Sequence, residues 1–277
     1  MWKRRESGWI WILLVVVLVA AATIHFVQGF HFGHAAPAGF KDGCTQPVPI
    51  TAVASTSEHI RYVALPHDIS GQVTKFGGQP SWLDSPQWPV SRQLGTQMTF
   101  VGQIALDAKM FPGSHAKMAY VFLSDGDDLP YGTWDPDSGE NAVVLQPGGK
   151  VAVKTVDKAT GPTEPTQIDS PSGDRVEYRD TAYRVVSTPH ADAPFETDQQ
   201  LSSLSSTDQD NYFDSLLVDK IGGTPGFLAG AEFPCSAQRL IVQLGDPPFD
   251  INLADGGEAY VFMNANGTIG KFIIQSE

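Results

Sequence analysis

Two short stretches decide the fold of this chain: KFGGQPSWL at Lys75–Leu83 and KIGGTPGFL at Lys220–Leu228. Each has a lysine, a pair of glycines and a proline in the same places. Glycine reaches backbone conformations with positive φ that other residues avoid, and proline fixes its own φ. Each stretch therefore predicts a tight backbone turn, and the shared pattern predicts that the chain contains two related parts.

The similarity continues into the segments that follow these turns. Gln103 and Gln243 each lie between apolar residues, and AYVFL at Ala119–Leu123 matches AYVFM at Ala259–Met263 at the same spacing. Matching blocks in the same order indicate an internal repeat. A glutamine in an apolar strand needs hydrogen-bond partners, so we expect both amides to bind neighbouring backbone at the edge of the core.

The segments between turns are short and rich in Val, Ile, Phe and Tyr, which is typical of strands. The expected strands are Met98–Leu106, Met118–Leu123, Ala142–Gln146, Lys150–Val156, Arg239–Leu244, Ala259–Met263 and Lys271–Gln275. The clearest helix signal is Ser206–Leu217, which combines a capping Ser or Thr with an apolar stripe. We predict a β-rich α+β domain with two pseudo-repeats, near residues 70–156 and 207–277, preceded by one transmembrane helix.

The N-terminal segment has the features of a membrane anchor. A basic cluster, Lys3–Arg5, precedes an uncharged apolar run from Trp9 to Val27. Such a run is long enough to cross a bilayer as a helix, and the basic cluster stays in the cytoplasm. We expect a signal-anchor over residues 1–28, an extracytoplasmic tether over 29–60 and a globular domain over 61–277. The expected location is the inner membrane, single-pass, with a periplasmic C-terminal domain; cleavage after the apolar run is the alternative.

The charge balance restricts the partners. The formal net charge is −13, with 18 Lys and Arg against 31 Asp and Glu. An acidic surface repels phosphate backbones, so nucleic-acid binding is disfavoured. The same surface attracts cations or a basic protein partner at the membrane face, or it serves only to keep the domain soluble.

A search for familiar motifs excludes several activities. The sequence contains no G-x-S-x-G, no H-E-x-x-H and no Gly-rich phosphate-binding loop. Its two cysteines, Cys44 and Cys235, are isolated, which disfavours a structural zinc site. They are a candidate disulfide in an oxidising compartment, or else two free thiols. His25, His31 and His34 lie beside the apolar run, where a solvated tether explains them better than a metal site.

An acidic loop offers the best candidate for a cation site. Asp125, Asp127, Asp135 and Asp137 lie in SDGDDLPYGTWDPDSGE, and carboxylates at alternating loop positions can gather around Ca²⁺. The spacing differs from an EF-hand loop, because Glu140 occupies the place where glycine is needed. The two interpretations are a Ca²⁺ site and a solvated turn; no other cofactor is expected.

Three further residues are candidates for ligand binding: Trp88, Asp255 and Glu258. Asp255 and Glu258 flank two glycines just before the AYVFM segment. Paired carboxylates of this kind can carry acid–base chemistry. The simpler interpretation is a turn that begins with Asp-Gly.

Several blocks of the sequence resemble the YwqG-like family, a bacterial domain of unknown function. They are KFGGQPSWLDSPQWP (Lys75–Pro89), FVGQIAL (Phe100–Leu106), KIGGTPGFL (Lys220–Leu228), IVQLGD (Ile241–Asp246) and DGGEAYVFMN (Asp255–Asn264). The resemblance covers most of residues 70–275 and implies an α+β fold with recurrent Gly-Gly-x-Pro turns. It implies no activity, cofactor or catalytic residue. The anchor and the polar stretch near 157–200 depart from the family's usual pattern.

Three functions are consistent with these features. The first is a non-enzymatic binding module that presents an acidic surface to a protein partner at the membrane, for example in protection against a secreted toxin. The second is a binder of small molecules or envelope polymers with an aromatic cleft between the repeats. The aromatics are Trp82, Trp88, Tyr120 and Tyr260, which core packing explains equally well. The third is a carboxylate-dependent hydrolase, and the missing catalytic motifs favour binding over catalysis.

Overall fold

The computed structural model describes residues 55–124, 132–169, 176–245, 247–254 and 256–276. All of these residues belong to one compact unit. Its elements are β1 (Thr56–Leu65), β2 (Lys75–Phe76), β3 (Trp88–Pro89), β4 (Thr99–Ala105), β5 (Met118–Leu123), β6 (Asn141–Gln146), β7 (Thr155–Val156), β8 (Pro165–Asp169), β9 (Val176–Asp180), β10 (Ala182–Ala191), α2 (Asp198–Leu201), α3 (Ser206–Leu216), β11 (Lys220–Gly222), β12 (Arg239–Leu244), β13 (Glu258–Met263) and β14 (Gly270–Gln275).

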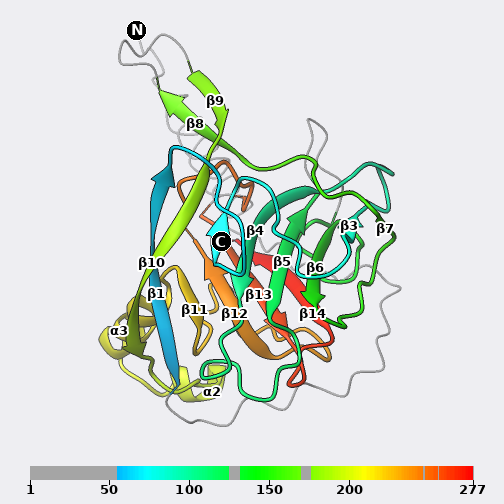
Figure 1. Ribbon diagram of the computed structural model, residues 1–277. Coiled ribbons are helices and arrows are strands. Elements are labelled where there is room, and N and C mark those ends of the chain that lie inside the picture. Colours follow the sequence, from blue (N-terminus) through cyan, green and yellow to red (C-terminus); the bar gives the residue numbers. More distant parts are fainter. Residues whose placement is uncertain (1–54, 125–131, 170–175, 246, 255, 277) are drawn as a thin grey trace, which may run out of the picture. The chain divides into compact units, whose positions relative to one another are not determined.

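Ten strands form one antiparallel sheet in the order β14-β13-β12-β11-β1-β10-β2-β4-β5-β6 (Figure 1). The sheet curls until its edge strands, β14 and β6, lie against each other. A backbone bridge between Lys150 and Ile269 and the packing of Gly270 on Val143 join the two edges. Two small sheets, β3–β7 and β8–β9, complete the strands, and the β8–β9 hairpin projects from the main sheet. The curled sheet thus encloses a core and leaves little free edge.

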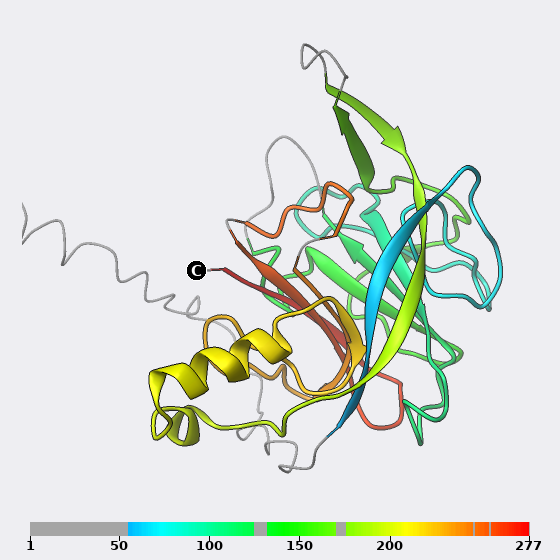
Figure 2. The same cartoon turned by 90° about the vertical axis from the view of Figure 1, so that its left-hand side faces the viewer.

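The sheet has an approximate two-fold symmetry about its centre, where β1 and β10 pair. We call β1, β2, β4, β5 and β6 the first half and β10 to β14 the second half. β1 crosses over to pair with β11, and β10 crosses over to pair with β2. Figure 2 shows β1 and β10 as two long strands side by side. Because Lys75 pairs with Arg184 and Lys220 pairs with His59, each residue of β1 has an equivalent position on β10.

The repeated glutamines bind backbone, as predicted from the sequence. Oε1 of Gln103 accepts the N–H of Ser81 at 2.7 Å, and Oε1 of Gln243 accepts the N–H of Gly226 at 3.0 Å. The amide of Gln243 also donates to the carbonyl of Leu216 at 3.0 Å. Both glutamine side chains are fully buried, so each satisfies backbone groups that water cannot reach.

A repeated tyrosine holds the same loops. The hydroxyl of Tyr120 accepts the N–H of Leu83 at 2.8 Å, and that of Tyr260 accepts the N–H of Leu228 at 3.0 Å. Each hydroxyl also donates to the carbonyl two residues earlier in that loop, at 2.8 and 2.7 Å. Burial raises the pKa of Tyr120 to about 12, so this hydroxyl remains a donor at neutral pH.

Strands β5 and β13 are buried along their whole length. The odd-numbered residues of β5 and β13 belong to one core that both halves share, inside the curled sheet. The even-numbered residues face outward into two separate cores. The segments around Trp88 and Val153 cover the outer face of β4, β5 and β6. Phe195 and Phe227 cover the outer face of β12, β13 and β14, so β5 and β13 are buried on both faces.

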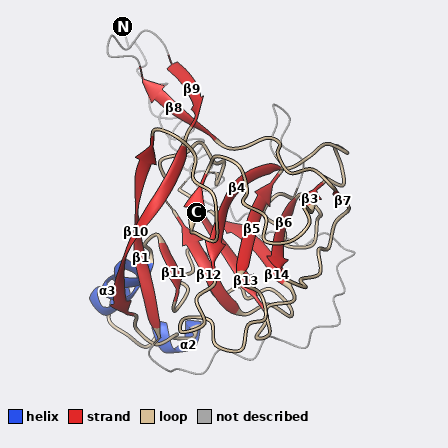
Figure 3. Ribbon diagram, viewed as in Figure 1, coloured by secondary structure: helices blue, strands red, loops and turns tan. Residues whose placement is uncertain are grey.

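The predicted α+β class with a preceding transmembrane helix is wrong for this structure. Strands dominate the described residues, and the two helices lie at one side of the sheet (Figures 2 and 3). Helix α3 buries only Leu216, so its apolar stripe forms no packed layer on the sheet. Within the described ranges, no helix is long and apolar enough to cross a membrane. The run from Trp9 to Val27 lies outside these ranges.

The boundaries of other predicted segments also differ. Strand β1 begins at Thr56, within the range expected for the tether. The strand expected over Lys150–Val156 is limited to Thr155–Val156. The long strand β10 falls in a stretch from which no strand was expected, because its outer half is exposed and polar.

The buried glutamines are expected to be essential for stability. Gln243→Leu leaves the N–H of Gly226 and the carbonyl of Leu216 without partners, which costs about 2–4 kcal/mol. Urea unfolding of the variant measures this loss. Gln199→Leu, on the exposed surface of α2, is the matched control and is expected to stay within about 0.5 kcal/mol of wild type. Equal effects of the two substitutions would contradict the role assigned to Gln243.

Candidate functional site

Four aromatic rings fill one end of the space inside the curled sheet. Tyr62 of β1 and Tyr183 of β10 meet edge to face with ring centroids 6.4 Å apart. Phe249, from the loop between β12 and β13, stacks on Phe76 at 5.5 Å and contacts both tyrosines. The hydroxyl of Tyr183 also donates to the carbonyl of Pro248 at 3.3 Å. This end of the sheet is therefore closed by packed side chains.

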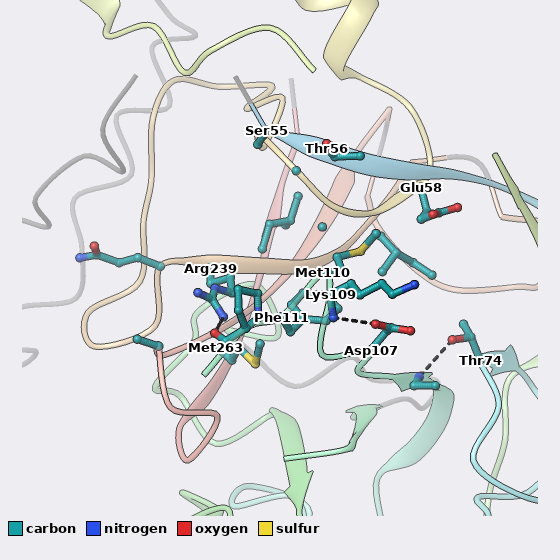
Figure 4. Close-up of a pocket in the computed structure, with 18 of the residues that line it drawn as sticks. Ser55, Thr56, Glu58, Thr74, Asp107, Lys109, Met110, Phe111, Arg239 and Met263 are labelled. Atoms are coloured by element: carbon teal, nitrogen blue, oxygen red, sulfur yellow. Dashed lines mark hydrogen bonds between the residues drawn. The ribbon is translucent and has the colours of Figure 1, made fainter. Parts of the chain in front are cut away.

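The other end carries different residues at the equivalent positions. The pairing of β1 and β10 places Glu58 where the closed end has Tyr183, and Ser187 where it has Tyr62. Ile221 replaces Phe76. These smaller or polar side chains leave a pocket of about 1150 Å³, which Glu58, Ser187 and Ile221 all line (Figure 4).

The pocket combines apolar walls with a charged rim. Met110, Phe111, Leu240 and Met263 supply apolar surface, and all but Met110 are fully or almost fully buried. The charged lining residues are Glu58, Asp107, Lys109 and Arg239. Figure 4 shows Glu58 and Lys109 on one side of the pocket and Arg239 on the other. A pocket of this size with convergent polar groups is typical of a ligand site.

The loop between β4 and β5 forms one wall, and its conformation is fixed by hydrogen bonds. The N–H of Lys109 donates to Oδ1 of Asp107 at 2.6 Å, and the N–H of Phe111 donates to the Asp107 carbonyl at 2.8 Å. Nη1 of Arg239 donates to the carbonyl of Pro112 at 2.8 Å. The pocket is therefore built before any ligand arrives.

A second wall is the Gly222-Gly223 turn, which a buried ion pair holds in place. Nζ of Lys220 lies 3.2 Å from Oδ2 of Asp192, and both side chains are fully buried. The same oxygen accepts the N–H of Thr224 at 2.9 Å. Oδ1 of Asp192 accepts the Ser57 hydroxyl at 2.6 Å. Gly223 has φ of 81° and lies so close to Asp192 that a Cβ would clash, which explains the glycine.

The electrostatics of this ion pair follow from its burial. Burial alone would raise the pKa of Asp192, but the Ser57 hydroxyl, the Lys220 ammonium and the Thr224 N–H together lower it below its ordinary value. Burial lowers the pKa of Lys220, and the attraction of Asp192 opposes that change. Each charge thus depends on the other for compensation inside the protein.

The first half contains an equivalent ion pair. Nζ of Lys75 lies 2.6 Å from Oδ1 of Asp68, and the N–H of Gln79 donates to Oδ2 of Asp68 at 2.8 Å. Lys75 is as buried as Lys220, but the side chain of Asp68 is 36% exposed. The lysine of each repeated turn therefore has a structural role. The two ion pairs differ mainly in the exposure of the aspartate to water.

This difference predicts unequal costs of removing each lysine. Lys220→Met leaves Asp192 charged and buried, which is expected to destabilise the protein by about 3–5 kcal/mol. Lys75→Met is expected to cost clearly less, because water can solvate Asp68. Urea unfolding at neutral pH compares the two variants directly. Equal losses would show that exposure of the aspartate does not decide the cost.

Glu258, one of the predicted binding residues, lies at the start of β13 and is 8% exposed. Its Oε2 is buried without a hydrogen-bond partner, and its other oxygen lies against Gly245. Burial, followed by the nearby charge of Asp219, raises the pKa of Glu258 to about 7. The equivalent residue of β5 is the apolar Met118. Glu258 does not line the pocket.

The raised pKa predicts a specific dependence of stability on pH. The ordinary value is 4.5 and the folded value about 7, so the folded protein binds more protons than the unfolded chain between these pH values. Stability contributed by Glu258 is therefore lost as pH rises from about 4.5 to 7, by up to about 3 kcal/mol. Glu258→Gln is expected to remove this slope and to stabilise the protein at pH 8. Unfolding curves of wild type and variant that run parallel with pH would contradict the assignment.

The other predicted binding residues do not gather around the pocket. Trp88 is fully buried in the outer core of the first half, where its indole N–H donates to the carbonyl of Met98 at 2.7 Å. Asp255 lies outside the described residues. The structure therefore brings Trp88 and Glu258 into separate parts of the domain, on different halves of the sheet.

Of the predicted calcium ligands, Asp125 and Asp127 lie outside the described residues. Asp137 forms an ion pair with Lys271 of β14, and Oδ1 of Asp135 accepts the N–H of Asp137 at 2.8 Å. Asp137 thus joins its loop to β14, whereas the carboxylate of Asp135 bonds within its own loop. Cys235 is disulfide-bonded, and Cys44 lies outside the described residues.

Sequence reasoning missed the residues that shape the site. Lys75 and Lys220 begin the two repeated turns, and a lysine that occurs beside two glycines in both repeats was a signal for a structural ion pair. The aspartates that pair with these lysines had no such signal, because their spacing along the chain differs between the repeats. Asp68 lies in the loop just before Lys75, whereas helices α2 and α3 separate Asp192 from Lys220. Glu58 had no signal either, since its place in the pocket follows from strand register.

Comparison with known protein families and with curated proteins gives no match that bears on the function. No protein family matches the chain, and no curated protein matches it. The resemblance to the YwqG-like family stays a prediction, and the function must be argued from the geometry of the pocket.

Proposed function

We propose that this domain is a binding module that holds an amphipathic, cationic ligand in the pocket between β1, β11 and the β4–β5 loop. The observation that carries the proposal is the difference between the two ends of the curled sheet. Four aromatic rings close one end, whereas Glu58 and Ser187 replace the tyrosines at the other. The protein fills this space with its own side chains at one end and leaves a pocket at the other.

The lining supports a ligand with an apolar body and a positive group. Phe111, Leu240 and Met263 offer apolar contact to the body. Among the charged lining residues, Lys109 is exposed to solvent and Arg239 is engaged by the carbonyl of Pro112. Glu58 is half-buried on the pocket wall, and a carboxylate in such a place is best compensated by a cation. The net charge of −13 raises the local concentration of cations around the domain.

Two kinds of molecule carry a positive group that fits this pocket. One is a small amphipathic amine, and the other is a lysine side chain of a basic protein partner. The second source agrees with the partner expected from the acidic composition, including the protective role against a toxin. A hydrolytic function has less support, because Glu258 is buried in β13 and does not line the pocket.

Titration calorimetry with octylamine and octanoate tests the proposal. Octylamine is expected to bind, and octanoate of the same length is expected to bind at least about tenfold more weakly because it faces Glu58 with a like charge. Glu58→Gln is expected to lower the affinity for octylamine about tenfold, since a charge-assisted contact contributes about 1.5–3 kcal/mol. Binding should also weaken with salt.

Two variants separate the pocket from the surface. Ser187→Tyr restores the tyrosine of the closed end and is expected to abolish binding, whereas Ser203→Tyr, on the exposed turn after α2, is expected to leave binding unchanged. A short peptide with one lysine between two leucines, measured alongside, distinguishes a partner's side chain from a small amine. Equal affinity for octylamine and octanoate, or unaltered binding by Ser187→Tyr, would contradict the proposal.

A further inference from the structure

Two histidines and an aspartate meet on the outer face of β1 and β10, and the aspartate lies behind the Gly222-Gly223 wall of the pocket. His59 and His190 stack with ring centroids 4.2 Å apart and an interplanar angle of 26°. One ring nitrogen of each histidine and one carboxylate oxygen of Asp192 lie within 4.8 Å of one another. Such a set of two imidazoles and one carboxylate is a common ligand set for transition-metal ions.

The fold does not require these histidines. The ion pair of Asp192 with Lys220 has its counterpart in Asp68 and Lys75, so it belongs to the repeated turn. The histidines have no such counterpart. On the strand pairing, Arg184 occupies the position equivalent to His59, and Leu65 occupies the position equivalent to His190. The two imidazoles therefore lie near Lys220, whereas the equivalent positions near Lys75 hold an arginine and a leucine.

One of the two imidazoles has free ligand capacity, and the other is open to solvent. Nε2 of His59 is buried without a hydrogen-bond partner, which is costly for a polar atom unless something binds it. The side chain of His190 is 45% exposed, so an ion can enter from solvent on that side. Nδ1 of His190 lies 3.3 Å from Oδ1 of Asp192.

This distance is informative because it is long for a hydrogen bond. Two ligand atoms about 2.0–2.1 Å from a tetrahedral Zn²⁺ ion lie about 3.3 Å from each other. An ion can therefore enter between His190 and Asp192 with little movement of either, while the ring of His59 must turn out of its stack on His190 to aim a nitrogen at the ion. We propose that His59, His190 and Asp192 form a binding site for a divalent transition-metal ion of the Zn²⁺ type.

The surroundings of Asp192 suit the role of a metal ligand. Its Oδ2 is held by Lys220 and the N–H of Thr224, and its Oδ1 accepts the hydroxyl of Ser57. Such outer hydrogen bonds fix the orientation of a ligating carboxylate. Lys220 leaves the aspartate with little net charge to offer, so the two imidazoles supply most of the affinity. Three protein ligands leave a fourth position for water or another molecule.

Zinc titration of the full-length chain, without an affinity tag, tests the site. The background carries His25→Asn, His31→Asn and His34→Asn, so that the N-terminal histidines do not contribute. One equivalent of Zn²⁺ is expected to bind, measured by competition with a chromogenic chelator. His59→Asn and His190→Asn are each expected to weaken binding by at least about tenfold. His67→Asn, an exposed histidine in the turn after β1, is the control and is expected to change nothing.

Substitution with Co²⁺ gives an independent readout, because tetrahedral nitrogen and oxygen ligands produce strong visible absorption. This absorption is expected in the background protein and is expected to be lost in His190→Asn. His190 is exposed, so this variant keeps the fold even if His59→Asn does not, and thermal unfolding without metal verifies that. Absence of saturable Zn²⁺ binding, or equal binding by the His190→Asn and His67→Asn variants, would overturn the proposal.

Discussion

The antiparallel pairing of β1 with β10 is the constraint on which the rest of the structure depends. It joins ten residues of each strand in continuous register, from Thr56 opposite Ala191 to Leu65 opposite Ala182. Each strand crosses to the other half, where it covers the short strand β11 or β2. Strands of two or three residues are poor sheet edges by themselves, so the exchange provides the pairing that lets the sheet continue. Without it, each half would expose its inner core face.

Burial on both faces explains how much of the fold could be predicted from the sequence. The strands β4, β5, β12 and β13 were predictable because their dense apolar residues and bounding glycines are local signals. The contacts of Gln103 and Gln243 were predictable because a buried amide must find partners. The α+β class was wrong because the apolar stripe of α3 looked able to cover a sheet, whereas it buries only Leu216. Strands β1 and β10 escaped notice because their outward residues are polar and their inward ones change character along the strand.

The pocket was beyond the reach of the sequence for a related reason. Glu58 and Tyr183 share neither chemistry nor neighbours, and only the register of β1 and β10 shows that they take equivalent places. The signal that points to function is thus a mismatch between halves that otherwise agree. The same logic separates Lys220 from His59. Both lie beside Asp192, but Lys220 has an equivalent lysine in Lys75, whereas the position equivalent to His59 is Arg184.

A repeated fold of this kind can divide its tasks between its two ends. Phe76, Tyr62, Tyr183 and Phe249 form a packed end that contributes stability, because large rings bury much apolar surface there. That stability allows the opposite end to keep a half-buried carboxylate and open space, both of which cost free energy in a closed core. The internal symmetry also explains why the fold tolerates the free-energy cost of this open end. The turns, amides and ion pairs that define the fold are present on both sides. A ligand that fills the open end would supply the apolar contacts that the protein's own rings supply at the other.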